Sequence, residues 1–271
     1  MAMSINKNAG AMIALQSLSA TTRNLETTQM RVTTGLRVAG PKDDAATFAI
    51  AQNMRGDIAG MGAVKTNLAL GQSITNVAID AGKAVADLLI EMKAKAVQAS
   101  QEGLDTDSYT ALHQEFTSLR NQIESIVATA EFNGKNLIDS AATDLKVLST
   151  VDGSTITVTK QSIDTTTLGI LTISLTNATV AATALTAVSQ AIIDVSNALA
   201  SLGSGAKRID IQADFTGKLM DILKQGVGNL VDADLAQESA NLQAFQIKQQ
   251  LGVQALAIAN AGPQAILSLF G

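Results

Sequence analysis

The stretch that decides the fold is NLVDADLAQESANLQAFQIKQQLGVQALAIANAGPQAILSLF, residues 229–270. Its apolar residues recur at the spacing of an α-helix, but they fall on two nearly opposite faces. A surface helix of a monomeric protein carries one apolar stripe, which faces its own core. The two stripes therefore predict two different coverings for this helix. Leu235, Leu242, Phe245, Val253 and Leu256 form one stripe, and Ile247, Leu251 and Ile258 form the other.

The composition favours close-packed helices over a thick globular core. Hydrophobic residues make up 46% of the 271 residues, whereas aromatic residues make up only 3%. Large compact cores depend on aromatic side chains, which bury the most area per residue. The apolar residues here are mostly Ala, Leu, Ile and Val, a mixture typical of packed helices. We therefore expect an elongated, helix-rich protein.

Few residues are available for catalysis. The chain has no Cys and a single His, His113, which we expect to face solvent. The net charge of −5 argues against a nucleic-acid partner, since such a surface needs an excess of Lys and Arg. The pairs Asp43/Asp44 and Asp232/Asp234 are interpreted as helix-start residues, where a negative charge is favourable. No phosphate-binding loop is present. We predict no enzyme activity and no catalytic, cofactor-binding or metal site.

The sequence predicts neither a cleavable signal peptide nor a membrane span. The first residues, MAMSINKNAGAMIALQ, contain no continuous apolar segment. Residues 165–193 carry no charge, but Thr, Ser and Asn interrupt the run of about 20 apolar residues that a span requires.

Four earlier segments are also predicted to be helices: residues 4–35, 41–100, 106–130 and 181–227. Pro41 is expected to open the second of them at its first turn. The third is expected to end before Asn133-Gly134, which is a strong turn pair. In the first segment Leu15, Leu18, Leu25 and Val32 recur at the spacing of a coiled-coil seam.

The middle of the chain has a different period. β-branched residues flank Asp152-Gly153, which predicts a β-hairpin, and residues 168–176 predict another strand. A chain that runs out and returns along helices brings its two ends together. The predicted fold is mainly α with a small β portion: an elongated antiparallel helical coiled-coil bundle with a β-hairpin region at its outer end. The predicted parts are a terminal coiled coil (1–36 with 235–271), a helical rod (37–136 with 180–234) and a hairpin region (137–179).

Several motifs resemble those of bacterial flagellins. On the N-terminal side they are INKN (5–8), TTGLR (33–37), DDAA (43–46) and FNG (132–134). On the C-terminal side they are DADLAQES (232–239), KQQLGVQALAIAN (248–260) and PQAILSLF (263–270). These motifs occur in the family's order and at its spacing. The short middle resembles that of a flagellin with a minimal outer variable domain.

The resemblance implies a secreted structural subunit that polymerises into the extracellular flagellar filament for motility. In flagellins the terminal helices pair as a coiled coil, and their other faces pack on neighbouring subunits. The implied partners are further copies of the chain, the flagellar export apparatus, a flagellin chaperone, and the filament cap and hook-junction proteins. We expect an intrachain coiled coil of Leu15, Leu18, Leu25, Val32, Leu235, Leu242, Phe245 and Leu256. We expect inter-subunit or chaperone contacts by Ile247, Leu251, Ile258, Ile266, Leu267 and Phe270.

One site departs from the family pattern. Many flagellins carry a Gln-Arg pair on the long helix that the animal Toll-like receptor for flagellin recognises, and Ile90 and Glu91 stand about there in this chain. An anion in place of a cation reverses the local electrostatics of such an interface. We therefore expect weak or absent receptor activation. Flagellins with this departure occur among alphaproteobacteria, which are the expected source.

Three alternatives remain open at this point. A hook–filament junction protein shares the terminal helices of a flagellin. An adhesin or a secreted enzyme on a flagellin-like frame would need a larger inserted domain than this middle allows. A helical signalling coiled coil is the third, against which the β-hairpin and the lack of a predicted membrane span both count.

Overall fold

The computed structural model describes residues 7–270, with side chains described for residues 7–261. The chain divides into two compact units, one formed by Asp57–Asp221 and the other by the residues on either side of that segment. The finer three-part division expected from the sequence stays a prediction. The described elements are α1 (Ala9–Thr34), α2 (Ala45–Ala99), α3 (Thr106–Thr129), β1 (Glu131–Phe132), β2 (Lys135–Asn136), β3 (Leu145–Leu148), β4 (Thr155–Val158), α4 (Ala178–Val231) and α5 (Leu235–Phe270).

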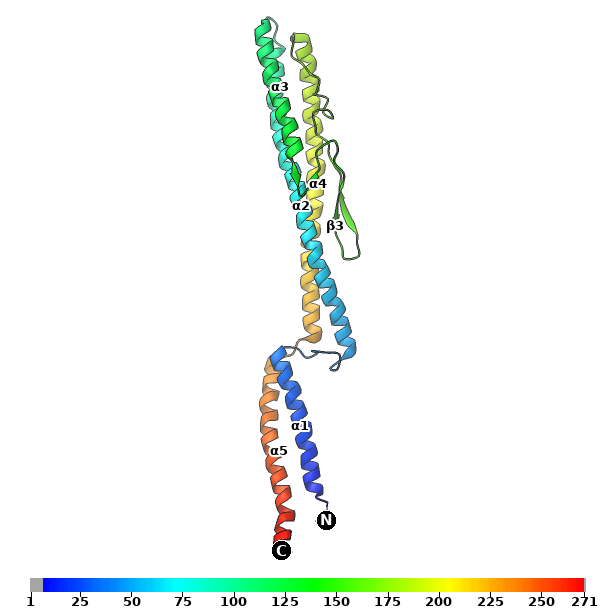
Figure 1. Ribbon diagram of the computed structural model, residues 1–271, viewed down its shortest axis with the longest axis vertical. Helices are drawn as coiled ribbons and strands as arrows, with labels where there is room; N and C mark the ends of the chain where they lie inside the picture. Colours follow the sequence, from blue (N-terminus) through cyan, green and yellow to red (C-terminus); the bar gives the residue numbers. More distant parts are fainter. Residues whose placement is uncertain (1–6, 271) are drawn as a thin grey trace. The chain divides into compact units, whose positions relative to one another are not determined.

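In the terminal unit, α1 and α5 lie side by side (Figure 1). α1 begins after Asn8, whose side chain accepts a hydrogen bond from the backbone N–H of Ala11, and it ends at Gly35 with φ of 72°. Glycine is favoured at this position because it adopts the left-handed conformation without a Cβ clash. α5 begins after Asp234, whose carboxylate accepts hydrogen bonds from two backbone N–H groups in the first turn.

The long helix α2 begins at Ala45, so the prediction that Pro41 opens it is wrong. The carboxylate of Asp43 accepts hydrogen bonds from the two backbone N–H groups that precede Pro41, which holds the proline in a turn outside the helix. Asp44 then caps α2, because it accepts hydrogen bonds from the backbone N–H and the hydroxyl of Thr47. The interpretation as helix-start chemistry agrees with the contacts of Asp44, whereas Asp43 stabilises the preceding turn.

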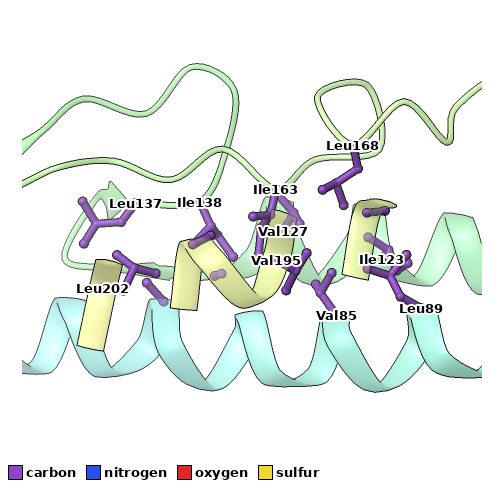
Figure 2. Packing of buried hydrophobic residues seen from close by; sticks show 14 of the residues in the cluster. Val85, Leu89, Ile123, Val127, Leu137, Ile138, Ile163, Leu168, Val195 and Leu202 are labelled. Carbon is purple, nitrogen blue, oxygen red and sulfur yellow. The ribbon is translucent and has the colours of Figure 1, made fainter. Parts of the chain in front are cut away.

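The Asp57–Asp221 unit has a continuous core where α2, α3 and α4 meet. Phe116 and Ile123 of α3 are fully buried in this core. In Figure 2 the side chains of Val85 and Leu89 from α2 lie close to those of α3 and α4. Loop residues complete this core from outside the helices: Leu137, Ile138, Ile163 and Leu168 are all buried there (Figure 2).

The predicted hairpin around Asp152-Gly153 is present as the antiparallel pair of β3 and β4. It packs along the sides of α2 and α4 at helix glycines, whereas the sequence placed it at the outer end of the bundle. At each contact the missing Cβ makes room for a hairpin valine. A Cβ at Gly60 would lie 2.9 Å from Val151, one at Gly71 2.5 Å from Val147, and one at Gly205 2.8 Å from Val158.

The strand predicted at residues 168–176 does not form, because side chains of α3 take the place of a partner strand. The guanidinium of Arg120 donates to the carbonyl of Leu171 at 2.5 Å. The backbone N–H of Leu175 donates to Nδ1 of His113 at 3.2 Å. His113 is thus half-buried with a defined partner, and the expectation that it faces solvent is wrong.

Helix α4 runs through Gly203 and Gly205 without a break. By length and composition alone, it is the one helix in the described residues that is long and apolar enough to cross a membrane. In this structure one face of the same helix, including Val188, Val195 and Leu202, lies in the protein core. A core-facing helix passes the same compositional test as a membrane span.

Candidate functional site: the paired terminal helices

Polar and close apolar contacts along the pair show that α1 and α5 run antiparallel. Asn8 at the start of α1 donates to the backbone carbonyl of Ala259, late in α5, at 2.7 Å. Near the middle, a Cβ on Gly252 would lie 3.1 Å from Cδ1 of Leu18. At the end of α1, Arg31 donates to Glu238, in the first turn of α5, at 3.0 Å. Each contact further along α1 falls earlier on α5.

The seam between the two helices is thin. Thr28 is the only buried residue on α1 and Glu238 the only one among the described side chains of α5. Most predicted seam residues are half-buried: Leu18, Leu25, Val32, Leu242, Phe245 and Leu256. Two predicted members, Leu15 and Leu235, are instead 54% and 51% exposed.

Small and polar residues take some of the places that the sequence predicted for the largest apolar ones. Ala11 and Ala14 are half-buried beside the more exposed Leu15, and Thr28 is buried. The row Ala14, Leu18, Thr21, Leu25, Thr28 and Val32 keeps strict three-four spacing. A pattern of apolar residues alone misses Thr28, although the strict heptad phase through Leu18, Leu25 and Val32 points to it.

The outward face of the pair carries large apolar side chains. On α5, Ile247 and Leu251 are each 57% exposed and Ile258 is 74% exposed. On α1, Met12 and Ile13 are similarly uncovered. Ile266, Leu267 and Phe270 lie outside the described side chains. The second stripe of the sequence is therefore bare within one chain, as far as its described residues go.

Two aspartates with lowered pKa values cap helices. Hydrogen bonds from Thr47 lower the pKa of Asp44, which caps α2, and hydrogen bonds from Ser108 lower the pKa of Asp105, which caps α3. Across the residues that the structure describes, no group of three His, Cys, Asp or Glu side chains could hold a metal ion.

Ile90 and Glu91 lie on α2 with their side chains exposed. Beside them, Lys95 forms an ion pair with Glu115 of α3. A shallow depression between α2 and α3 is lined by Glu91, Lys95 and Glu115 among others. The lining of this depression thus includes two carboxylates and a lysine that is paired with one of them.

Comparison with known proteins identifies the class to which this pairing of terminal helices belongs. Residues 5–143 match the bacterial flagellin N-terminal helical region, and residues 185–270 match the bacterial flagellin C-terminal helical region. Flagellin FljK of Caulobacter vibrioides is 48% identical over 268 residues, which are 98% of each chain. The flagellin of Brucella melitensis is 36% identical over 280 aligned residues, covering 98% of this chain and 99% of that protein.

Solved structures show the same fold. The crystal structure of Bacillus cereus flagellin matches with a TM-score of 0.51 at 24% identity, covering 55% of this chain and 88% of that one. A putative flagellar hook-associated protein from Vibrio parahaemolyticus matches with a TM-score of 0.58 at 13% identity, covering 70% of this chain and all of that one.

The chain belongs to the bacterial flagellin family. Its near full-length relatives support the alphaproteobacterial type that the sequence predicted. It is a structural subunit of the bacterial flagellar filament, and the resemblance of its terminal motifs to flagellins is confirmed.

Proposed function

We propose that the outward face of α5, with Ile247, Leu251 and Ile258, packs on neighbouring subunits and drives filament assembly. The observation that carries this proposal is the exposure of three large apolar side chains on a helix whose other face is paired. Large apolar side chains gathered on one exposed helix face are typical of an interaction site. The proposed surface continues along the sequence to Ile266, Leu267 and Phe270.

Burial of this surface would contribute favourably to the free energy of assembly. Burial of apolar area contributes about 25 cal/mol per Å2, so a few hundred Å2 per contact amounts to several kcal/mol before ordering costs. A contact between different faces of identical subunits does not have to close into a ring. Repetition of such a head-to-tail contact gives a helical polymer.

The same proposal assigns a role to each part of the chain. Residues 1–36 with 235–271 form the inner coiled coil of the filament, through Leu15, Leu18, Leu25, Val32, Leu235, Leu242, Phe245 and Leu256. Residues 37–136 with 180–234 form the rod, and residues 137–179 form the hairpin region. The subunit has no catalytic role. It is secreted through the flagellar export apparatus, with a chaperone on its C-terminal segment and the cap and hook-junction proteins as filament partners.

The surface at Ile90 and Glu91 is proposed to evade the animal receptor for flagellin. Glu91 places negative charge there, and the adjacent Lys95 is already paired with Glu115. A cell reporter assay is expected to show weak or absent activation by the purified chain. Full potency in that assay would contradict the proposal.

Seeded polymerisation viewed by electron microscopy tests the assembly surface. The variant L251D/I258D places two charges on the outward face of α5, and Q250D/Q254D places the same charges on exposed polar positions of that helix. We expect the native chain and Q250D/Q254D to elongate filament seeds and L251D/I258D to remain monomeric. A chain truncated after Ala233, which lacks α5, is expected to remain monomeric as well.

Two results would overturn this assignment. Elongation by L251D/I258D at the native rate would show that the outward face is not an assembly surface. Failure of the native chain to elongate any seed would instead favour the hook–filament junction protein, which shares the terminal helices.

A further inference from the structure

The side chain of Asn8 makes two hydrogen bonds that belong to two different helices. Its Oδ1 accepts from the backbone N–H of Ala11 at 3.0 Å, which caps the start of α1. Its Nδ2 donates to the backbone carbonyl of Ala259 in α5 at 2.7 Å. One amide group therefore ties the beginning of α1 to a defined point on α5.

A carbonyl inside an α-helix normally accepts from the N–H group four residues later. For Ala259 that residue is Pro263, which lies within α5 and has no N–H. The proline leaves this carbonyl without its helical partner. Because Ala259 is half-buried, a carbonyl without a partner is costly there, so it calls for an outside donor.

We infer that Asn8 and Pro263 act together as a positioning pair that fixes where the first turn of α1 docks on α5. Pro263 leaves one carbonyl of α5 without its hydrogen-bond donor within the helix, and the amide of Asn8 supplies a donor in its place. The pair selects the register of the two helices at this end, in addition to capping α1.

The seam between the helices needs such a device because it discriminates weakly between registers. Its half-buried residues on α1 are mostly Ala, Thr and Leu, and a shift by one heptad keeps the same faces together. Such a shift would bring Asn8 opposite the carbonyl of Gly252. The residue four positions later there is Leu256, which has its own N–H, so that carbonyl is already partnered within α5.

The opposite end of the pair has separate ties and does not depend on Asn8. Leu36 forms a backbone bridge with Asp232, and the backbone N–H of Ala233 donates to the carbonyl of Gly35. Arg31 and Glu238 add an ion pair nearby. Loss of the Asn8 contact is therefore expected to free the start of α1 while its end remains docked.

Because the chain contains no Cys, engineered disulfides can report on each end separately. A Cβ on Gly10 would lie 3.9 Å from Cβ of Ala259, and a Cβ on Gly252 would lie 3.7 Å from Cβ of Leu18. Both separations suit a disulfide. G10C/A259C thus reports on the Asn8 site, and L18C/G252C reports on the middle of the pair. Rates of disulfide formation are measured on the full-length chain, in solution and in seeded filaments.

The decisive variant is Asn8→Asp, which keeps an oxygen to cap α1 but loses the donor to Ala259. We expect it to slow disulfide formation in G10C/A259C by about tenfold, as for the loss of one well-placed hydrogen bond. The rate of disulfide formation in L18C/G252C should change by less than about twofold. Pro263→Ala restores the N–H at position 263 and favours helix formation. It should nevertheless also slow disulfide formation in G10C/A259C, because the carbonyl of Ala259 regains its helical donor. In the P263A background, Asn8→Asp should have no further effect. Asn24→Asp, on the exposed face of α1, is the matched control and should change neither rate.

Three results would overturn the inference. The first is an unchanged rate of disulfide formation in G10C/A259C when Asn8→Asp is introduced. The second is an equal slowing of both reporters, which would show general unpairing of the helices. The third is an undiminished effect of Asn8→Asp in P263A, which would show that Asn8 and Pro263 act independently. The inference rests on pairing within one chain, so failure of the chain to polymerise while both disulfides form would count against the proposed function alone.

Discussion

The terminal pair and the Asp57–Asp221 unit show the same heptad spacing in sequence but very different burial. In the Asp57–Asp221 unit, residues such as Leu89, Phe116 and Val195 are fully buried, because they belong to a core that α2, α3 and α4 share. In the pair of α1 and α5, the seam residues are mostly half-buried, and an outward apolar face remains uncovered. The apolar period thus predicts that a helix face is covered, but it does not say which chain covers it.

The largest expected contrast comes from making the same substitution in both regions. Leu89→Ala should lower the free energy of unfolding of the monomer by about 2–5 kcal/mol, because it leaves a cavity in a closed core. Leu251→Ala removes the same atoms from a side chain that is 57% exposed, so it should change monomer stability very little. Urea unfolding followed by circular dichroism measures both.

The same two variants separate folding from assembly. Leu251→Ala should raise the concentration needed for seeded filament growth, whereas its unfolding curve should overlay that of the native chain. A large loss of monomer stability on Leu251→Ala would break the comparison, since it would show that the outward face is already covered within one chain.

A second contrast lies within α2, between two glycines that look alike in sequence. Gly71→Ala should destabilise the monomer by about 1–3 kcal/mol, because the new Cβ would lie 2.5 Å from Val147 of the hairpin. Gly62→Ala meets nothing within 4 Å and should stabilise the helix by about 1 kcal/mol. Thermal unfolding of the two variants should therefore move in opposite directions.

The double variant G71A/V147A is the control for this explanation. Removing the valine methyl groups that meet the new Cβ should recover part of the loss caused by Gly71→Ala. If stability does not recover, the loss of stability in Gly71→Ala does not come from the contact between α2 and the hairpin.

These glycines show what the sequence could and could not predict. The helices, the hairpin at Asp152-Gly153 and the turn at Asn133-Gly134 follow from period and turn chemistry, both of which are local. The contact of Gly71 with a hairpin valine is not local, so the sequence alone did not predict it. The strand predicted at residues 168–176 failed for the same reason, since Arg120 and His113 satisfy its backbone from a distant helix.

The terminal site was predictable in outline but not in detail. The second apolar stripe of residues 229–270 indicates that a second covering exists for this helix, but not which chain supplies it. The seam was misplaced at Leu15, because strict heptad phase favours Ala14 and Thr28 over larger neighbours. The motifs that contain Asn8 and Pro263 are recognisable in the sequence, whereas the hydrogen bond from Asn8 to Ala259 depends on the pairing of two distant helices.

The smallest expected effect concerns the loop around Asp164, which covers the core of the Asp57–Asp221 unit. Loosening this loop tests whether the burial of that core depends on a covering that the terminal pair lacks. Burial of Asp164 by itself raises the pKa of its carboxyl, but hydrogen bonds from Thr167 and Thr166 outweigh burial and hold the pKa below its ordinary value of 3.8. Because the folded state binds this proton more weakly than the unfolded state, the stabilisation is fully present above the ordinary pKa. It is lost as the pH falls through the lowered pKa of the folded state.

Thr167→Val removes one donor and should raise the pKa of Asp164, so acid unfolding should begin at a higher pH than in the native chain. Unfolding followed by circular dichroism between neutral and acid pH measures this shift, and identical acid transitions in the two proteins would show that Asp164 does not hold the loop on the core.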